Sequence, residues 1–141
     1  MLKPQNRLKK VRDFNLVLKH GKWVGNDLIS LKILNLDKLN PKNLPKIIKN
    51  GTTKEQENFK KQLRLAIACG LKIHKNAVKR NRLKRQVSEV VRLIIKDKKL
   101  KVGYYILIQP KKELLLINDQ ERMAKISQNL KLLFKTGKIL V

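Results

Sequence analysis

The segment from Asn76 to Lys96 constrains the fold more than any other part of the chain. Its apolar residues recur at intervals of three and four, the spacing of one face of an α-helix. They are Leu83, Val87, Val90, Val91, Ile94 and Ile95. Asn76 stands where an N-cap residue is expected. A long helix with one apolar stripe needs another layer of structure on which to bury that stripe.

Several other segments have the apolar character of β-strands. They are rich in Leu, Ile, Val and Tyr, and turn or loop residues lie between them. The predicted strands are 28–36, 63–68 and 102–109, and Trp23 with Val24 begins a shorter, earlier strand. Pro110 closes the last strand, because proline cannot donate a hydrogen bond to a sheet.

Two further amphipathic helices complete the predicted order of elements. One covers residues 8–19 and stops before Gly21, and the other begins after the N-cap residue Asn118. Their apolar stripes are Val11, Phe14, Val17 and Leu18 in the first helix, and Met123, Ile126, Leu130, Leu133 and Phe134 in the last. The order is therefore α-β-β-β-α-β-α. We expect an α+β two-layer sandwich in which helices cover one face of a single sheet.

Residues 35–62 differ in composition from the segments around them. They contain Pro41, Pro45 and Gly51 together with many Asn and Lys residues, and an unstructured loop of this length is uncommon inside a compact domain. Thr52 and Glu55 have the spacing of a capping box for a short helix that would reach Phe59. We interpret this segment as a basic insertion within one domain that spans residues 1–141.

The overall charge limits the possible partners. The chain has 35 Lys and Arg against 10 Asp and Glu, a net charge of +25, and such a surface calls for a polyanion. An apolar run of membrane-spanning length is missing, and so is the apolar core of a secretory signal. We therefore expect nucleic acid rather than a membrane. The single cysteine, Cys69, fits a reducing cytoplasm.

The positive charge is concentrated at the start of the long helix. Residues 58–88 contain ten Lys and Arg and no Asp or Glu, and the density is highest over residues 79–85. Cations at a helix N-terminus are unfavourable by about 0.3–1 kcal/mol each, whereas phosphate is favoured there. Asn81 can hydrogen bond to a base edge or a ribose hydroxyl. This pattern predicts RNA binding. A merely solvated basic face is the simpler alternative.

The same run of residues carries a resemblance. The sequence Lys75-Asn76-Ala77-Val78-Lys79-Arg80-Asn81-Arg82-Leu83-Lys84-Arg85 closely resembles the signature of the bacterial ribonuclease P protein family. Its centre is Arg80-Asn81-Arg82. Residues 6–10, Asp13-Phe14, residues 19–21 and the strand 63–67 are also similar to that family.

The resemblance implies a fold and a role. The fold would be similar to the second domain of ribosomal protein S5, with a left-handed βαβ crossover against the usual right-handed rule. The partners would be the ribonuclease P RNA subunit and precursor tRNA, from which the 5′ leader is removed. Catalysis would lie in the RNA subunit, which would hold the Mg²⁺ that activates water. The protein itself would bind no cofactor and no metal and would supply no catalytic residue.

The resemblance also implies two groups of site residues. The expected RNA-binding residues are Arg7, Lys72, Lys75, Lys79, Arg80, Asn81, Arg82, Lys84 and Arg85. The expected leader cleft, between the first helix and the sheet, contains Phe14, Leu18, Lys32 and Arg64. Leu18 and Lys32 stand where the family usually has Phe and Tyr. Leader binding would therefore depend more on charge and less on stacking.

Two other classes of protein remain possible from the residues alone. A ribosomal or other structural RNA-binding protein has the same size and charge. A protein nuclease would need clustered carboxylates or a suitably placed histidine, and the acidic residues here are scattered. A zinc site is not expected, because Cys69, His20 and His74 lack the spacing of zinc ligands.

Overall fold

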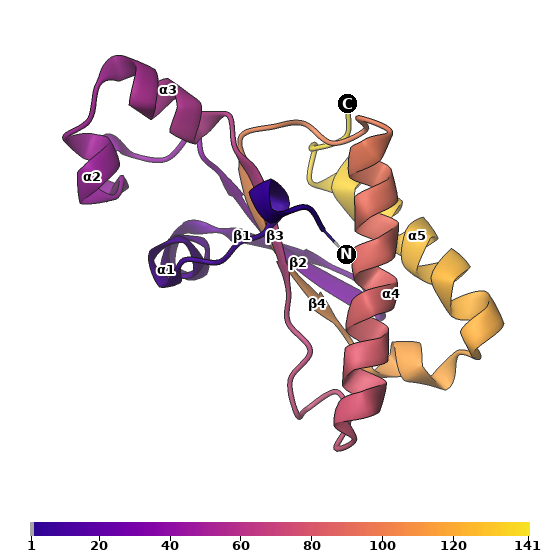
Figure 1. The fold of residues 1–141 in the computed structure, drawn as a ribbon. Coiled ribbons are helices and arrows are strands. Elements are labelled where there is room, and N and C mark those ends of the chain that lie inside the picture. Colours follow the sequence, from indigo (N-terminus) through magenta and orange to yellow (C-terminus); the bar gives the residue numbers. More distant parts are fainter. Residues whose placement is uncertain (1) are drawn as a thin grey trace.

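The computed structural model describes residues 2–141, in which four strands form one sheet in the order β1-β2-β4-β3 (Figure 1). The strands are β1 (Lys22–Gly25), β2 (Ile29–Asn35), β3 (Leu63–Ile67) and β4 (Tyr104–Pro110). The helices are α1 (Val11–His20), α2 (Lys46–Lys49), α3 (Thr53–Lys60), α4 (Ala77–Lys96) and α5 (Asp119–Thr136). Short 3₁₀ turns are η1 (Pro4–Asn6), η2 (Pro41–Asn43) and η3 (Lys112–Leu116). The predicted α+β class and order of elements are confirmed.

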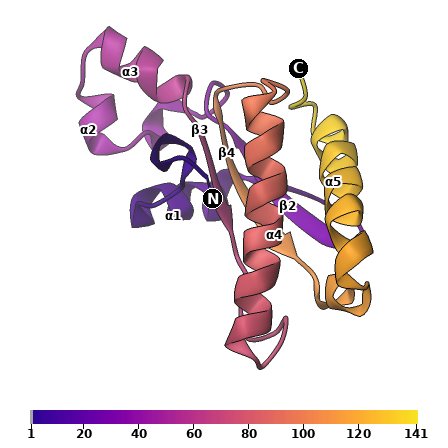
Figure 2. The same cartoon turned by 45° about the vertical axis from the view of Figure 1, so that its right-hand side comes forward.

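Strand β4 joins the two halves of the sheet. It pairs antiparallel with β2 and parallel with β3. Parallel neighbours require a crossover connection, and α4 provides it on the same side of the sheet as α5 (Figures 1 and 2). The crossover from β3 through α4 to β4 is left-handed, as the resemblance implied.

The main core lies between the sheet and the pair of helices α4 and α5. Successive strand residues point to opposite faces, and Leu31, Leu65 and Ile106 lie buried on this face. The predicted stripes of both helices are buried against them. Leu83, Val87 and Val91 come from α4, and Ile126, Leu130 and Phe134 come from α5. This packing holds the C-terminal part of α4 in place and positions its N-terminal part.

The other face of the sheet carries α1, so the prediction that helices cover only one face is wrong (Figure 1). Val17 of α1 is buried against Leu34, Tyr105 and Leu107 in a second core. The physical reason is visible in β4, which is apolar at successive positions and can therefore bury both of its faces. Tyr104 and Tyr105 are neighbours in this strand and point to opposite faces, and only Tyr105 is fully buried.

The insertion forms η2, α2 and α3, which pack on the end of the sheet beside α1 (Figure 1). The Thr52 hydroxyl accepts a hydrogen bond of 3.2 Å from the Glu55 N–H, so the predicted cap of α3 is confirmed. Phe59 is buried, with its ring edge-on to Tyr105 at 5.9 Å between centroids. The second core therefore anchors the insertion.

The predicted starts of α4 and α5 are confirmed, and the predicted start of α1 is wrong. Asn76 and Asn118 cap α4 and α5 through their side-chain oxygens, as expected. Helix α1, however, begins at Val11 rather than at Leu8. The Leu8 N–H donates to the Leu65 carbonyl at 2.9 Å, which ties this residue to β3 in an extended conformation. A long-range backbone bond of this kind has no local sequence signal.

Candidate nucleic-acid interface

The first half of α4 presents cations to solvent while one side of the helix stays in the core. Lys79, Lys84 and Arg85 are exposed, as is Asn81. Leu83, in the same stretch, is completely buried. None of these cations is paired with a carboxylate in the described part of the chain, which leaves them available to an anionic partner.

Arg82 differs from its neighbours because it already has an acidic partner. Its guanidinium lies 2.8 Å from the Asp119 carboxylate at the start of α5, and both side chains remain partly exposed. Asp119 also accepts a 2.7 Å hydrogen bond from Arg122. Exposed ion pairs of this kind contribute about 0–1 kcal/mol. A phosphate can therefore compete with Asp119 for Arg82.

Arg122 was not identified from the sequence, although it organises this end of the molecule. It is a buried arginine that donates to the carbonyls of Leu114 at 3.0 Å and Ile117 at 2.8 Å. It also donates to Gln86 of α4 at 3.3 Å. Its fork of donors thus ties η3 and α5 to α4. The sequence indicated this role only through the spacing of Arg122 from Asp119, which is that of an i,i+3 pair in a helix.

Arg80 is less exposed than the other cations of α4. Its Nε atom is buried, and within residues 2–141 it has no hydrogen-bond partner. Arg80 and Lys84 are near enough to Cys69 to lower the pKa of its thiol, but burial outweighs them and raises that pKa to about 11. Cys69, which is partly buried, is therefore protonated near neutral pH and unreactive.

The loop between β3 and α4 adds further cations beside the helix start. Lys72 and Lys75 are exposed. His74 accepts a 2.9 Å hydrogen bond from the Asn76 N–H through Nδ1, so it stabilises the turn that leads into the helix. The predicted cations 72–85 therefore come together on one end of the molecule.

The expected cleft residues of α1 lie on the other face of the sheet. Phe14 is half-buried against the second core, and Leu18 is half-exposed. The Lys32 ammonium donates to the Leu18 carbonyl at 2.6 Å and lies 5.2 Å from the centre of the Trp23 ring. Trp23, directly opposite Lys32 in the sheet, is 53% exposed. An accessible aromatic surface is thus present here, on Trp23 as well as on Phe14.

Arg7 and Arg64 use their guanidinium groups within the protein. Arg7 donates to the Leu2 carbonyl at 2.8 Å, and Arg64 donates to the Arg7 carbonyl at 3.0 Å. Nearby, the Tyr105 hydroxyl donates to Gln62 at 2.6 Å, and burial together with the charge of Asp13 raises the pKa of Tyr105. Both arginines are half-buried. They fasten the N-terminal segment to β3 and carry positive charge beside α1.

A groove on the same face of the sheet as α1 reaches the basic loop before α4. Beyond Lys32, the sheet face that α1 leaves open is formed by Ser30, Gln109 and Ala68, which lie side by side in neighbouring strands. These residues line a cavity of about 530 Å³ that continues to Lys72 in the basic loop. Ser30 and Ala68 are small and leave its floor open, so an extended strand can lie along it. Lys72, Lys111 and Lys112 line this groove together with one acid, Glu113, and Lys72 belongs to the basic loop before α4.

Sites of two other kinds are absent from residues 2–141, the part of the chain that the structure describes. No group of His, Cys, Asp and Glu within this range is arranged to hold a metal ion. No helix in this range is long and apolar enough to span a membrane. The surface that remains, with cations around an open groove, suits a polyanionic chain.

The fold and this surface define a class of protein: a small, strongly basic α+β domain whose surface charge suits a polyanion. The family model described as "Ribonuclease P" matches residues 2–136. The chain therefore belongs to the ribonuclease P protein family. The resemblance inferred from residues 75–85 is confirmed, and the family favours this assignment over a ribosomal protein.

Individual relatives agree with this assignment. The ribonuclease P protein component of Rickettsia felis is 30% identical over 122 residues, which cover 86% of this chain and 91% of the relative. The ribonuclease P protein of Thermotoga maritima is 26% identical, with a TM-score of 0.62 over 92% of this chain and 96% of that one. The Staphylococcus aureus protein, at 20% identity, shares the fold with a TM-score of 0.66 over 96% of this chain and 98% of that one.

Proposed function

We propose that this chain is the protein subunit of ribonuclease P, binds the RNA subunit and assists removal of the 5′ leader from precursor tRNA. The observation that carries the proposal is the open cationic surface at the start of α4, held in position by the buried Leu83. Cations in the first turn of a helix oppose its dipole. Their concentration there is favourable when phosphates bind.

We assign the two ends of the groove to different RNA elements. The cations of residues 72–85 would meet the phosphates of a folded RNA. The groove over Ser30 and Gln109 would take the single-stranded leader, which then passes Lys32 and Phe14. Trp23 and Phe14 supply stacking surfaces, and each stacked base is worth about 1–3 kcal/mol in single-strand binders.

In this proposal the chemical step belongs to the RNA subunit. That RNA would hold the Mg²⁺ and activate the attacking water. The chain's own residues would bind and orient the leader and reduce repulsion between phosphates. The protein would raise affinity for precursor over mature tRNA, because only the precursor carries a leader.

Reconstitution tests this division of labour. Purified protein freed of RNA should not cleave precursor tRNA. Together with a bacterial ribonuclease P RNA, it should raise single-turnover cleavage most at low Mg²⁺, where phosphate repulsion is least screened. Cleavage by the RNA-free protein, or an RNA subunit that gains nothing from it at any Mg²⁺ concentration, would contradict the proposal.

Phe14 provides a test of the leader path. Phe14→Leu keeps most of the apolar volume that contacts the second core and removes the aromatic ring. We expect the holoenzyme to bind leader-bearing precursor about 5–100-fold more weakly, from the loss of one stacked base, with mature tRNA little affected. Equal losses for both ligands would show that Phe14 is only a core residue. Melting temperatures measured in parallel separate binding from folding.

A further inference from the structure

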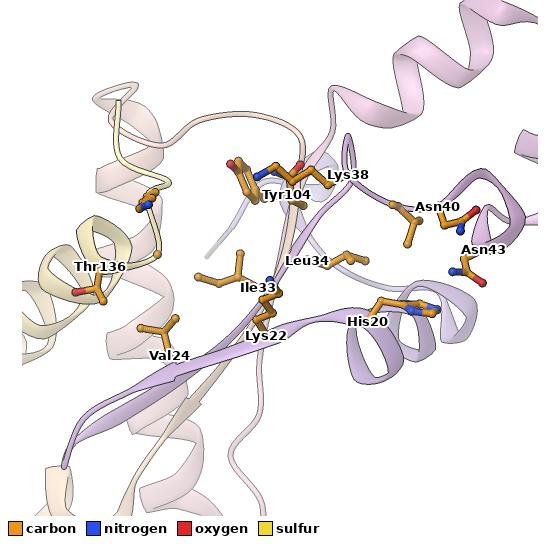
Figure 3. Close-up of a pocket in the computed structure, with 14 residues that line it drawn as sticks. His20, Lys22, Val24, Ile33, Leu34, Lys38, Asn40, Asn43, Tyr104 and Thr136 are labelled. Carbon is orange, nitrogen blue, oxygen red and sulfur yellow. The ribbon is translucent and has the colours of Figure 1, made fainter.

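A second basic cavity lies at the end of the sheet away from the start of α4 (Figure 3). Its volume is about 600 Å³, within the range of ligand sites. It opens where β2 extends past β1, because Lys22 pairs with Ile33 while Asn35 has no partner in β1. The insertion forms one side, and the end of α5 forms the other. Tyr104, half-buried, also contributes its ring to the wall.

The lining of this cavity is cationic and contains no acid. Lys22, Lys38 and Lys138 line it, with no Asp or Glu among the described lining residues. All three lysines are exposed, and none is in an ion pair in the described part of the chain. They come from β1, from the insertion and from the segment after α5. Cations spread over three segments can follow a charged chain rather than enclose one small ion.

The amide side chains in the wall are oriented as donors. The Asn35 oxygen accepts a 3.1 Å hydrogen bond from the Asp37 N–H, and the Asn40 oxygen accepts one of 3.0 Å from the Lys42 N–H. Each oxygen is thus engaged by the backbone, and the amide nitrogens of Asn35 and Asn40 have no acceptor among the described residues. A wall of amide donors and ammonium groups selects anionic oxygens.

The negative ends of the two nearby helices are neutralised within the chain. At the end of α5, the Leu133 and Phe134 carbonyls accept from Gly137 and Ile139. At the end of α1, the Leu18 carbonyl accepts from Lys32. Free carbonyls at a helix C-terminus would repel an anion. With these carbonyls bonded, the lysines dominate the charge of the cavity.

Lys138 occupies a backbone conformation that favours glycine. Its φ is 61°, in the left-handed region, directly after Gly137. Lys98 has the same conformation after α4, with a φ of 55°, so this geometry is a way of ending a helix in this fold. It places Lys138 among the residues that line the cavity.

We propose that this cavity is a second RNA contact, in which the lysines and amides hold the phosphodiester backbone of an unpaired strand and Tyr104 stacks on a base. The proposal rests on the proposed function of the protein. The strand belongs either to the RNA subunit or to the precursor, and the chemistry of recognition is the same for both. The insertion thereby gains a role, since it supplies Lys38 and Asn40.

A charge-matched pair of variants tests the proposal. The cavity variant is Lys22→Gln, Lys38→Gln, Lys138→Gly. The control, Lys96→Gln, Lys125→Gln, Lys131→Gln, also removes three exposed lysines but lies outside the cavity. Each full-length protein is titrated with ribonuclease P RNA, and each holoenzyme with labelled precursor tRNA, at several salt concentrations. The cavity variant should lower the log–log salt slope by about 2, and the control should leave it nearly unchanged.

The two titrations, one with ribonuclease P RNA and one with precursor tRNA, identify the RNA to which the bound strand belongs. A change confined to the RNA subunit assigns the strand to it, and a change confined to the precursor assigns it to the substrate. Equal behaviour of cavity and control variants toward both RNAs would overturn the proposal. If even the wild-type protein fails to bind ribonuclease P RNA, the proposed function itself fails instead. Lys138→Gly alone should melt no lower than wild type, which separates the loss of charge from any loss of folding.

Discussion

Replacing Lys79, Lys84 and Arg85 by glutamine is expected to weaken binding to ribonuclease P RNA on the order of a hundred-fold at physiological salt. These three cations are exposed and have no carboxylate partner in the described part of the chain. Removing one cation that meets a phosphate should lower the log–log salt slope by about 0.7–0.9. The measurement is the affinity of the full-length protein for the RNA over a series of salt concentrations.

The same variant should be as stable as the unchanged protein or slightly more stable, although it binds RNA more weakly. Lys79 lies in the first turn of α4, where a cation opposes the helix dipole by about 0.3–1 kcal/mol. The buried Leu83 that anchors this stretch is unchanged. Weaker RNA binding with an unchanged or higher melting temperature would therefore identify a binding surface.

The control for this experiment is the Lys96→Gln, Lys125→Gln, Lys131→Gln protein, which loses the same charge at exposed positions elsewhere. If that protein loses as much affinity as the α4 variant, the effect comes from net charge alone. The basic face of α4 would then be merely solvated. A clear difference between the two variants locates the RNA-binding surface on α4.

The sequence predicted the elements well where the signals are local. The stripe of α4 and the caps Asn76 and Asn118 depend on spacing within one helix, and the structure confirms them. The strand order and the left-handed crossover depend on contacts between distant segments. The crossover came from the resemblance to a family, and the strand order was not predicted, because periodicity does not specify which strands become neighbours.

Other features of the fold escaped prediction for the same reason. Helix α1 covers the second face of the sheet, and its start at Val11 depends on a bond between Leu8 and Leu65. The insertion was recognised, but its anchoring by Phe59 on Tyr105 requires the folded second core. The run of apolar residues in β4 does indicate that both faces of this strand are covered, and Tyr105, Ile106 and Leu107 are all buried.

The candidate site was predicted in part. The cations of residues 72–85 follow from charge density and lie together in the structure. The groove over Ser30 and Gln109 did not follow, because small and polar residues in a strand give no signal of an open floor. No sequence pattern indicated that Arg7 and Arg64 would donate to backbone carbonyls.

Arg122 is expected to be the polar residue whose loss destabilises the protein most. Arg122→Ala should cost about 3–5 kcal/mol of unfolding free energy, because it removes two short hydrogen bonds from a buried charged group to backbone carbonyls, each worth about 1.5–3 kcal/mol. The variant removes the donor to the Ile117 carbonyl, leaves the Leu114 carbonyl with only the Ile117 N–H at 3.3 Å, and takes one of two arginines from Asp119. For a chain of this length, that loss corresponds to a melting temperature lower by roughly 10 °C or more.

The shape of the Arg122 side chain matters as much as its charge. Arg122→Lys keeps the charge, but one ammonium cannot reach carbonyls and a carboxylate that the planar guanidinium contacts in several directions. We therefore expect Arg122→Lys to remain destabilised by at least about 2 kcal/mol. Arg92→Lys is the matched control, because Arg92 forms an exposed pair within one helix, worth about 0.3–0.5 kcal/mol. Denaturant unfolding of the two lysine variants compares them directly. If both lose the same small amount, Arg122 is only a surface ion pair, and the link from α5 to the basic end of α4 depends on apolar packing alone.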